Sequence, residues 1–144
     1  MAREKAARVV LAGGTRFEAE TASGHRVVMD SAEVAGDGSG GPSPMELVLV
    51  GLAGCTGMDV LAILRKMRQE VTAYAVSVRG IQAEEHPRVY TEVTVEHQVT
   101  GRNLNPELVR RAVELSETRY CPVGAMVGKT ARIVSTVTLV EAAE

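Results

Sequence analysis

The chain has 144 residues, of which 45% are hydrophobic and 24% are charged, and its formal net charge is −2. These values are typical of a globular protein, and we expect one domain over residues 1–144. Basic residues are spread along the chain, and aromatic residues make up only 3% of it. Both features argue against nucleic acid as a partner, because such binding needs clustered positive charge and aromatic rings for stacking.

The first predicted elements are three short strands, at residues 6–12, 15–22 and 25–30. Gly13-Gly14 and Ser23-Gly24 separate them, and such dipeptides favour tight turns between antiparallel strands. These runs therefore predict a small antiparallel sheet. The Gly/Ser/Pro-rich stretch 35–44 that follows predicts a loop.

A long helix is predicted after this loop, in the sequence SPMELVLVGLAGCTGMDVLAILRKMR. Ser43 is placed to be its N-cap, Pro44 its first helical residue, and Glu46 the partner of Ser43 in a capping box. The helix is apolar on nearly all sides, so we expect protein to enclose its apolar turns. The alternative, a membrane span over 45–64, is disfavoured by Glu46 and Asp59, because charges in lipid are costly.

Three glycines, Gly51, Gly54 and Gly57, surround Cys55 in this helix. A glycine inside a helix costs about 1 kcal/mol relative to alanine. That cost is tolerable where the flat surface lets another backbone or a ligand approach closely. The glycines therefore predict a close helix crossing, or a bound ligand, beside Cys55.

The rest of the chain predicts two hairpin strands and a closing strand, at residues 71–82, 88–101 and 132–142. Between the hairpin and the closing strand, a helix is predicted over 103–120 with Asn105 as its N-cap. Pro122 is suited to the first turn of a short further helix. This order of elements predicts the α+β class, with helices on one face of an antiparallel sheet.

The two cysteines are expected in different environments. Cys121 would be the N-cap of the short helix, where free N–H groups and the helix dipole lower the pKa of a thiol. Arg119 could add to this effect. Cys55 lies mid-helix among apolar residues, which raise the pKa of a thiol, and Asp59 one turn on disfavours a thiolate. From the residues alone Cys121 is the better candidate nucleophile, and the alternative is that both cysteines are packing residues that never meet.

No metal or cofactor is expected from the sequence. The cysteines form no CxxC motif, and His25, His86 and His97 do not stand at ligand spacing. We expect solvent contact for His97, in its alternating strand, and for His86, in its turn. The N-terminal sequence lacks the apolar core of a secretion signal, so we expect a cytoplasmic protein that is not bound to a membrane. In that reducing compartment two cysteines favour redox or catalytic use over a permanent disulfide.

The stretches PSPMELVLVGLAGCTGMDVLAILRKMR and ELSETRYCPVGAM resemble the OsmC/Ohr family, the osmotically inducible and organic hydroperoxide resistance proteins. The order of elements is similar over essentially the whole chain, and the motifs SPMEL, AGC and VTGRNL resemble a less characterised, OsmC-like branch. The resemblance implies an intertwined homodimer, in which sheets wrap around long central helices that pack together. A second copy of the helix would then cross near Cys55 and explain the glycines.

The resemblance further implies a thiol peroxidase that reduces organic hydroperoxides. Cys55 would be the peroxidatic cysteine and Cys121 the resolving one, which reverses the assignment made from the residues alone. In the family, an Arg from the N-terminal sheet and a Glu in the first turn of the long helix stabilise the first thiolate. Arg26 is the first candidate for this Arg and Arg16 the next, although either can face solvent. An external dithiol would restore the thiols.

The family's Glu has no exact counterpart in this chain. Met45 stands at its place and Glu46 one position later, so Glu46 can orient the Arg or serve only the capping box. We expect an apolar substrate pocket lined by Met45, Met58 and Met126. Should the support for the thiolate be lost, the alternative is a non-enzymatic or redox-sensing dimer of the same fold.

Overall fold

The structure is a computed structural model that describes residues 2–31 and 40–143 of the chain. The chain divides into two compact units, Met1–Val48 and Leu49–Glu144. The prediction of one domain stays a prediction, and each unit is described by itself below. The part of the predicted loop from residue 35 to residue 39 lies outside the described residues.

The N-terminal unit contains a three-stranded sheet with strands β1 (Ala7–Gly13), β2 (Arg16–Thr21) and β3 (Arg26–Met29). The strands pair antiparallel in the order β1-β2-β3, as predicted. The turn between the first two strands needs glycine, because Gly13 and Gly14 have φ angles of 135° and 59°. The glycines therefore allow the tight turn that joins these two strands.

Helix α1 (Pro44–Lys66) begins in the N-terminal unit, and its start confirms the predicted capping box. The Ser43 N–H donates to Glu46 Oε1 at 2.9 Å, and the Glu46 N–H donates to Ser43 Oγ at 3.1 Å. These two bonds satisfy backbone donors that the first turn of a helix leaves without partners.

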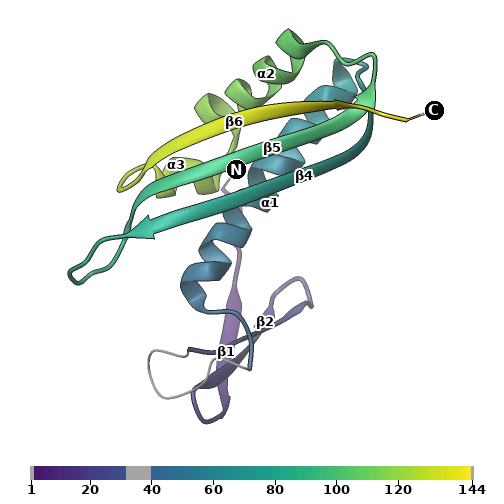
Figure 1. The fold of residues 1–144 in the computed structure, drawn as a ribbon. Coiled ribbons are helices and arrows are strands. Elements are labelled where there is room, and N and C mark those ends of the chain that lie inside the picture. Colours follow the sequence, from purple (N-terminus) through teal and green to yellow (C-terminus); the bar gives the residue numbers. More distant parts are fainter. Residues whose placement is uncertain (1, 32–39, 144) are drawn as a thin grey trace. The chain divides into compact units, whose positions relative to one another are not determined.

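The C-terminal unit holds most of α1 and a second three-stranded sheet (Figure 1). Its further elements are β4 (Glu70–Gln82), β5 (Tyr90–Arg102), α2 (Pro106–Leu115), a π-helical turn (Ser116–Tyr120), α3 (Pro122–Val127) and β6 (Arg132–Glu141). Asn105 caps α2 as predicted, since its side chain accepts from the N–H groups of Glu107 and Leu108.

Strand β6 is parallel to β5, which corrects the expected all-antiparallel sheet. Strands β4 and β5 form the predicted antiparallel hairpin. The chain then passes through α2 and α3 before it enters β6, and this crossover returns it to the end of the sheet from which β5 started. A hairpin loop cannot make such a connection, whereas a helical crossover can. The α+β class is confirmed, with one mixed sheet and one antiparallel sheet.

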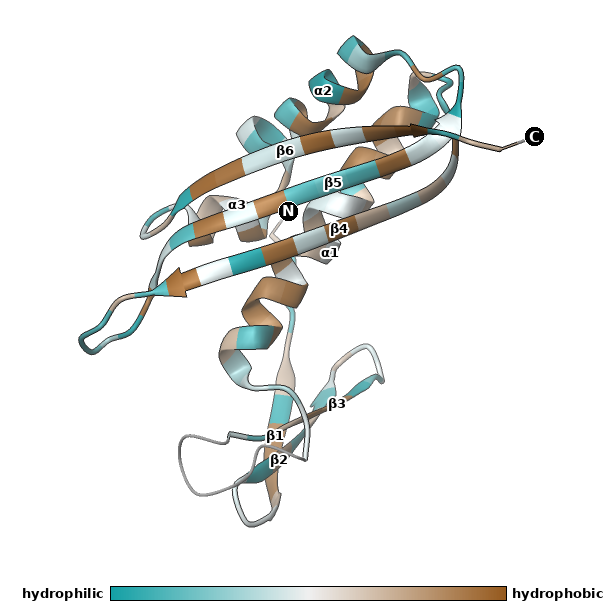
Figure 2. Ribbon diagram, viewed as in Figure 1, coloured by the Kyte–Doolittle hydropathy of each residue, from teal (hydrophilic) through white to brown (hydrophobic). Residues whose placement is uncertain are grey.

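The core of the C-terminal unit lies between its sheet and the helices α1 and α2, which cover the same face (Figure 1). Its buried residues are Val60 and Leu64 from α1, Val99 from β5, and Val109, Ala112 and Val113 from α2. Buried and exposed residues alternate along much of strand β5, whose hydropathy is drawn in Figure 2, and Val99 of this strand lies in the core. His97 belongs to the buried set with 1% exposure, so the expectation of solvent contact for this residue was wrong.

Helix α1 is not enclosed by its own chain in the C-terminal unit, so the expectation that protein encloses its apolar turns stays a prediction. Val50 is 60% exposed and Met58 is 75% exposed, although the helix is apolar along its length (Figure 2). A Cβ atom added at Gly51 or Gly54 would meet nothing within 4 Å. Among the described helices, α1 is the one with the length and hydropathy of a membrane span, a property that core helices share.

Candidate functional site

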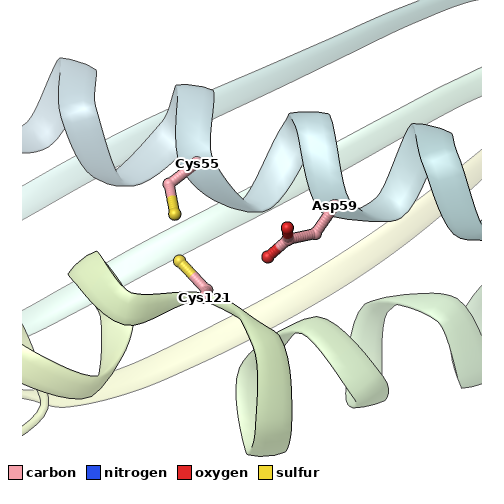
Figure 3. A group of neighbouring side chains, drawn as sticks. All are labelled: Cys55, Asp59 and Cys121. Atoms are coloured by element: carbon pink, nitrogen blue, oxygen red, sulfur yellow. The ribbon is translucent and has the colours of Figure 1, made fainter. Parts of the chain in front are cut away.

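The C-terminal unit brings Cys55, Asp59 and Cys121 together. The sulfur atoms of the two cysteines and a carboxylate oxygen of Asp59 all lie within 4.8 Å of one another. Cys55 and Asp59 lie one turn apart on α1, and both side chains point toward Cys121 at the start of α3 (Figure 3). The cysteines are both free thiols. The alternative in which the two sulfurs never meet is therefore wrong.

The position of Cys121 follows from the π-helical turn that continues α2. The Cys121 N–H donates to the Ser116 carbonyl oxygen at 2.8 Å. This hydrogen bond joins residues five positions apart, which is the spacing of a π-helix. Such turns occur frequently at functional sites. Pro122 then starts α3, and the Gly124 N–H donates to Cys121 Sγ at 3.3 Å. Cys121 is thus the N-cap of α3, as the sequence predicted.

A buried hydroxyl pair links α1 to the π-turn beside the cysteines. Thr56 Oγ1 and Ser116 Oγ lie 2.9 Å apart, and Ser116 Oγ donates to Asp59 Oδ2 at 3.2 Å. Thr56 is 4% exposed and Ser116 is fully buried. The sequence analysis missed both residues, because nothing in the spacing of two hydroxyl residues far apart in the chain signals that they pair.

Replacing Ser116 by Ala is expected to destabilise the C-terminal unit by about 1–2 kcal/mol, because it leaves Thr56 and Asp59 without their shared partner. Urea unfolding monitored by circular dichroism measures this change. Ser77→Ala, at an exposed position of β4, is the matched control and should change the free energy of unfolding by less than about 0.5 kcal/mol. Equal stability of the two variants would contradict a structural role for the Ser116 hydroxyl.

The pKa of Cys121 is raised to about 11, first because the thiol is buried and second through a hydrogen bond with Cys55. The Gly124 N–H acts in the opposite direction, as expected for an N-cap, but it does not outweigh burial. The negative charge of Asp59 also raises the pKa. The predicted lowering was therefore wrong in sign. Arg119 does not contribute to this shift, and its guanidinium lies over the ring of Tyr120, 5.5 Å from the ring centre.

A cavity of about 330 Å³ lies against Cys121 within the C-terminal unit. Its apolar lining includes Leu52, Val95 and Ile133. Glu117 also lines it, and burial, followed by the negative charge of Glu114, raises the pKa of this carboxyl. The sequence analysis did not single out this cavity, since its walls come from α1, β5, β6 and the π-turn.

The other predicted site residues fall into two groups. Met58 and Met126 are exposed, and neither lines the cavity beside Cys121. Met45, Arg26 and Glu46 belong to the N-terminal unit, where Glu46 completes the capping box and Arg26 is exposed on β3. A role for these three residues at the thiols stays a prediction.

These observations define a class of protein: an α+β chain with two free thiols and a carboxylate gathered between a long helix and the cap of a short one. The protein-family model described as OsmC-like protein matches residues 36–136. The chain is also 40% identical to Protein YhfA of Escherichia coli (strain K12) over 136 residues, which cover 94% of this chain and 98% of that protein. The chain therefore belongs to the OsmC-like family, as its cysteine motifs predicted.

Solved structures agree with this assignment. A crystal structure of a hypothetical protein from Aquifex aeolicus VF5 is similar with a TM-score of 0.87 at 27% identity, over 99% of this chain and 100% of that one. An organic hydroperoxide resistance protein OsmC from Legionella pneumophila has a TM-score of 0.72 at 17% identity, over 96% and 98% of the two chains. At this identity the second similarity concerns the fold.

Proposed function

We propose that this protein is a cytoplasmic thiol peroxidase that reduces organic hydroperoxides through Cys55 and Cys121. The observation that carries the proposal is the approach of the two sulfurs, which lie within 4.8 Å of each other. The two sulfurs of a disulfide lie about 2 Å apart. Small side-chain rotations can bring the two sulfurs from their separation in this structure to that distance. The organic hydroperoxide resistance protein from Legionella pneumophila, which has the same fold, supports the substrate class.

The proposed reaction has three steps. The Cys55 thiolate attacks one oxygen of the hydroperoxide, the O–O bond breaks, and an alcohol leaves while Cys55 becomes a sulfenic acid. The Cys121 sulfur then attacks the Cys55 sulfur, which forms the disulfide and releases water. An external dithiol reduces this disulfide in two exchange steps and becomes oxidised itself. No bound cofactor is needed for these steps.

The proposed roles of the surrounding residues follow the family. The cavity beside Cys121 is apolar enough to accept the organic part of a hydroperoxide. Arg26 is proposed to stabilise the Cys55 thiolate and Glu46 to orient Arg26, while Met45 contributes apolar surface for the substrate. A cation at the site would offset the negative charge of Asp59, which lies beside both sulfurs.

We propose that the chain acts as a homodimer. The uncovered face of α1 forms an open apolar groove with β4, lined by residues that include Ala53, Gly54, Met58 and Leu61. Gly51 and Gly54 leave space for a close helix crossing, which matches a second copy of α1 packing there. Exposed apolar faces of this kind mark interaction surfaces.

Peroxide consumption by the reduced protein tests the proposed function. With cumene hydroperoxide and an excess of dithiol, we expect repeated turnover. Without dithiol, we expect one equivalent of peroxide to be consumed per chain and two thiols to be lost. Absence of peroxide loss above the rate of the dithiol alone would contradict the proposal.

A second candidate function is redox sensing, in which the disulfide forms once and changes a surface for a partner. The raised pKa of Cys121 favours this candidate, because burial leaves little of this thiol as the thiolate that attacks a sulfenic acid. Sensing predicts stoichiometric oxidation without efficient turnover in dithiol, whereas a peroxidase turns over repeatedly.

A further inference from the structure

We propose that the reduced protein binds Zn²⁺ between Cys55, Asp59 and Cys121. Their ligand atoms, two sulfurs and one carboxylate oxygen, all lie within 4.8 Å of one another. In a tetrahedral zinc site, bonds of about 2.3 Å to sulfur and about 2.0–2.2 Å to oxygen place the ligands about 3.5–3.8 Å apart. The three atoms therefore need to move inward by about 1 Å at most, which side-chain rotation supplies.

The elements that carry the ligands suit a chelate. Cys55 and Asp59 are separated by four positions on α1, so their side chains lie on the same face one turn apart. Cys121 approaches the same point from the start of α3 (Figure 3). Two ligands from one helix and a third from a separate segment enclose the ion from different sides. Histidine spacing could not reveal this arrangement, because its ligands are two cysteines and an aspartate and include no histidine.

Charge also favours a divalent cation. As metal ligands, two thiolates and one carboxylate carry three negative charges within 4.8 Å of one another, and Cys121 is only 4% exposed. Like charges repel strongly at such distances away from bulk water. A doubly charged ion at the centre offsets most of this repulsion. Two sulfur ligands select Zn²⁺ over Mg²⁺ or Ca²⁺, which prefer oxygen.

The surroundings hold the ligands in place. Ser116 donates from its hydroxyl to Asp59 Oδ2 and accepts the Cys121 N–H at its carbonyl oxygen, so one residue orients two of the three ligands. Removing hydrogen-bond partners of metal ligands typically lowers the metal affinity by about 10–100-fold. Cys121 lines the cavity of about 330 Å³, so water can reach this ligand, and water is the usual fourth ligand where a protein supplies three.

Zinc binding does not depend on the proposed peroxidase activity, since it requires only reduced thiols. The two chemistries exclude each other in one molecule, because the same sulfurs cannot hold Zn²⁺ and form a disulfide. Zinc would thereby protect the thiols and keep the protein out of turnover until the metal is removed.

Metal titration of the full-length, reduced protein without peroxide tests the inference. With Co²⁺ as a spectroscopic substitute, we expect thiolate-to-cobalt charge-transfer absorption that saturates at one ion per chain. Competition with a chromogenic chelator then gives the Zn²⁺ affinity. Asp59→Asn should weaken it at least about tenfold, and Cys55→Ser or Cys121→Ser should reduce the charge-transfer absorption and weaken Zn²⁺ further.

Glu92→Gln, which neutralises an exposed carboxylate on β5, is the matched control and should bind Zn²⁺ as the unchanged protein does. Circular dichroism verifies that each variant is folded, and Asp59→Glu, which keeps a carboxylate, should retain more affinity than Asp59→Asn. Absence of saturable binding, or equal affinity of the Asp59→Asn and Glu92→Gln variants, would overturn the inference. Peroxide consumption measured in the presence of a chelator remains a separate test of the proposed function.

Discussion

Cys55→Ser is expected to lower hydroperoxide consumption by at least about 1,000-fold, to the level of the dithiol alone, because a serine hydroxyl is not ionised near neutral pH and does not attack the O–O bond. Cys121→Ser should have a different effect. Cys55 would still react once with the hydroperoxide, but its sulfenic acid would lack the neighbouring sulfur that lies within 4.8 Å in the unchanged protein. The two variants together therefore separate the peroxidatic from the resolving cysteine.

Mass spectrometry after one addition of cumene hydroperoxide distinguishes the products. The unchanged protein should lose two hydrogens as the disulfide forms, whereas Cys121→Ser should gain oxygen at Cys55 and react with dimedone. Cys55→Ser should remain unmodified at Cys121, because burial, the largest cause of the raised pKa of that thiol, does not depend on Cys55. If the hydroperoxide oxidises Cys121 in the Cys55→Ser variant, the roles of the two cysteines are reversed, as the helix position alone suggested.

The sequence predicts the local parts of the fold well because their causes are local. The capping box of Ser43 and Glu46, the glycine turn at Gly13 and Gly14, and the Asn105 cap all depend on residues within a few positions of one another. The same is true of the Cys121 cap, which the structure reproduces. Short-range signals of this kind act in any surrounding fold.

Long-range packing decided what the sequence could not predict. The direction of β6 depends on how far the α2–α3 crossover travels, which no local pattern specifies. The pKa of Cys121 depends on burial against α1, which outweighs the local effect of the Gly124 N–H. The approach of Cys55 to Cys121 came from the family resemblance, because sequence spacing alone does not bring together two elements so far apart in the chain.

His97 is the exception, since the sequence did contain the signal for its burial. Strand β5 alternates regularly, and His97 takes the same face as the buried residues Val95 and Val99. Its polarity suggested solvent, but the period of two was the stronger indication. The structure supplies the reason that burial is tolerated: the Tyr74 hydroxyl lies 2.6 Å from His97 Nδ1, and the two rings stack with 5.9 Å between their centres.

This buried pair predicts a loss of stability in mild acid. The Tyr74 hydroxyl and His97 Nδ1 share a hydrogen bond, while Nε2 is buried without a partner among the described residues. Burial lowers the pKa of His97 from 6.5 to about 4. The unfolded chain therefore binds a proton at His97 between these two values and the folded protein does not, so the free energy of unfolding falls as pH falls through this window.

The expected loss from His97 is about 3 kcal/mol between about pH 7 and about pH 4, because each unit of pKa shift corresponds to about 1.4 kcal/mol. Urea unfolding of the unchanged protein and of His97→Gln at both pH values measures it, since glutamine does not titrate and its amide oxygen can accept from Tyr74. The loss should be smaller by that amount in His97→Gln. His86→Gln removes an exposed imidazole from the β4–β5 connection and should lose as much stability as the unchanged protein. Equal acid sensitivity in the His97→Gln and His86→Gln variants would contradict this prediction. The loss of stability in acid would then come from other groups, and His97 Nε2 would find a hydrogen-bond partner when the imidazole is protonated.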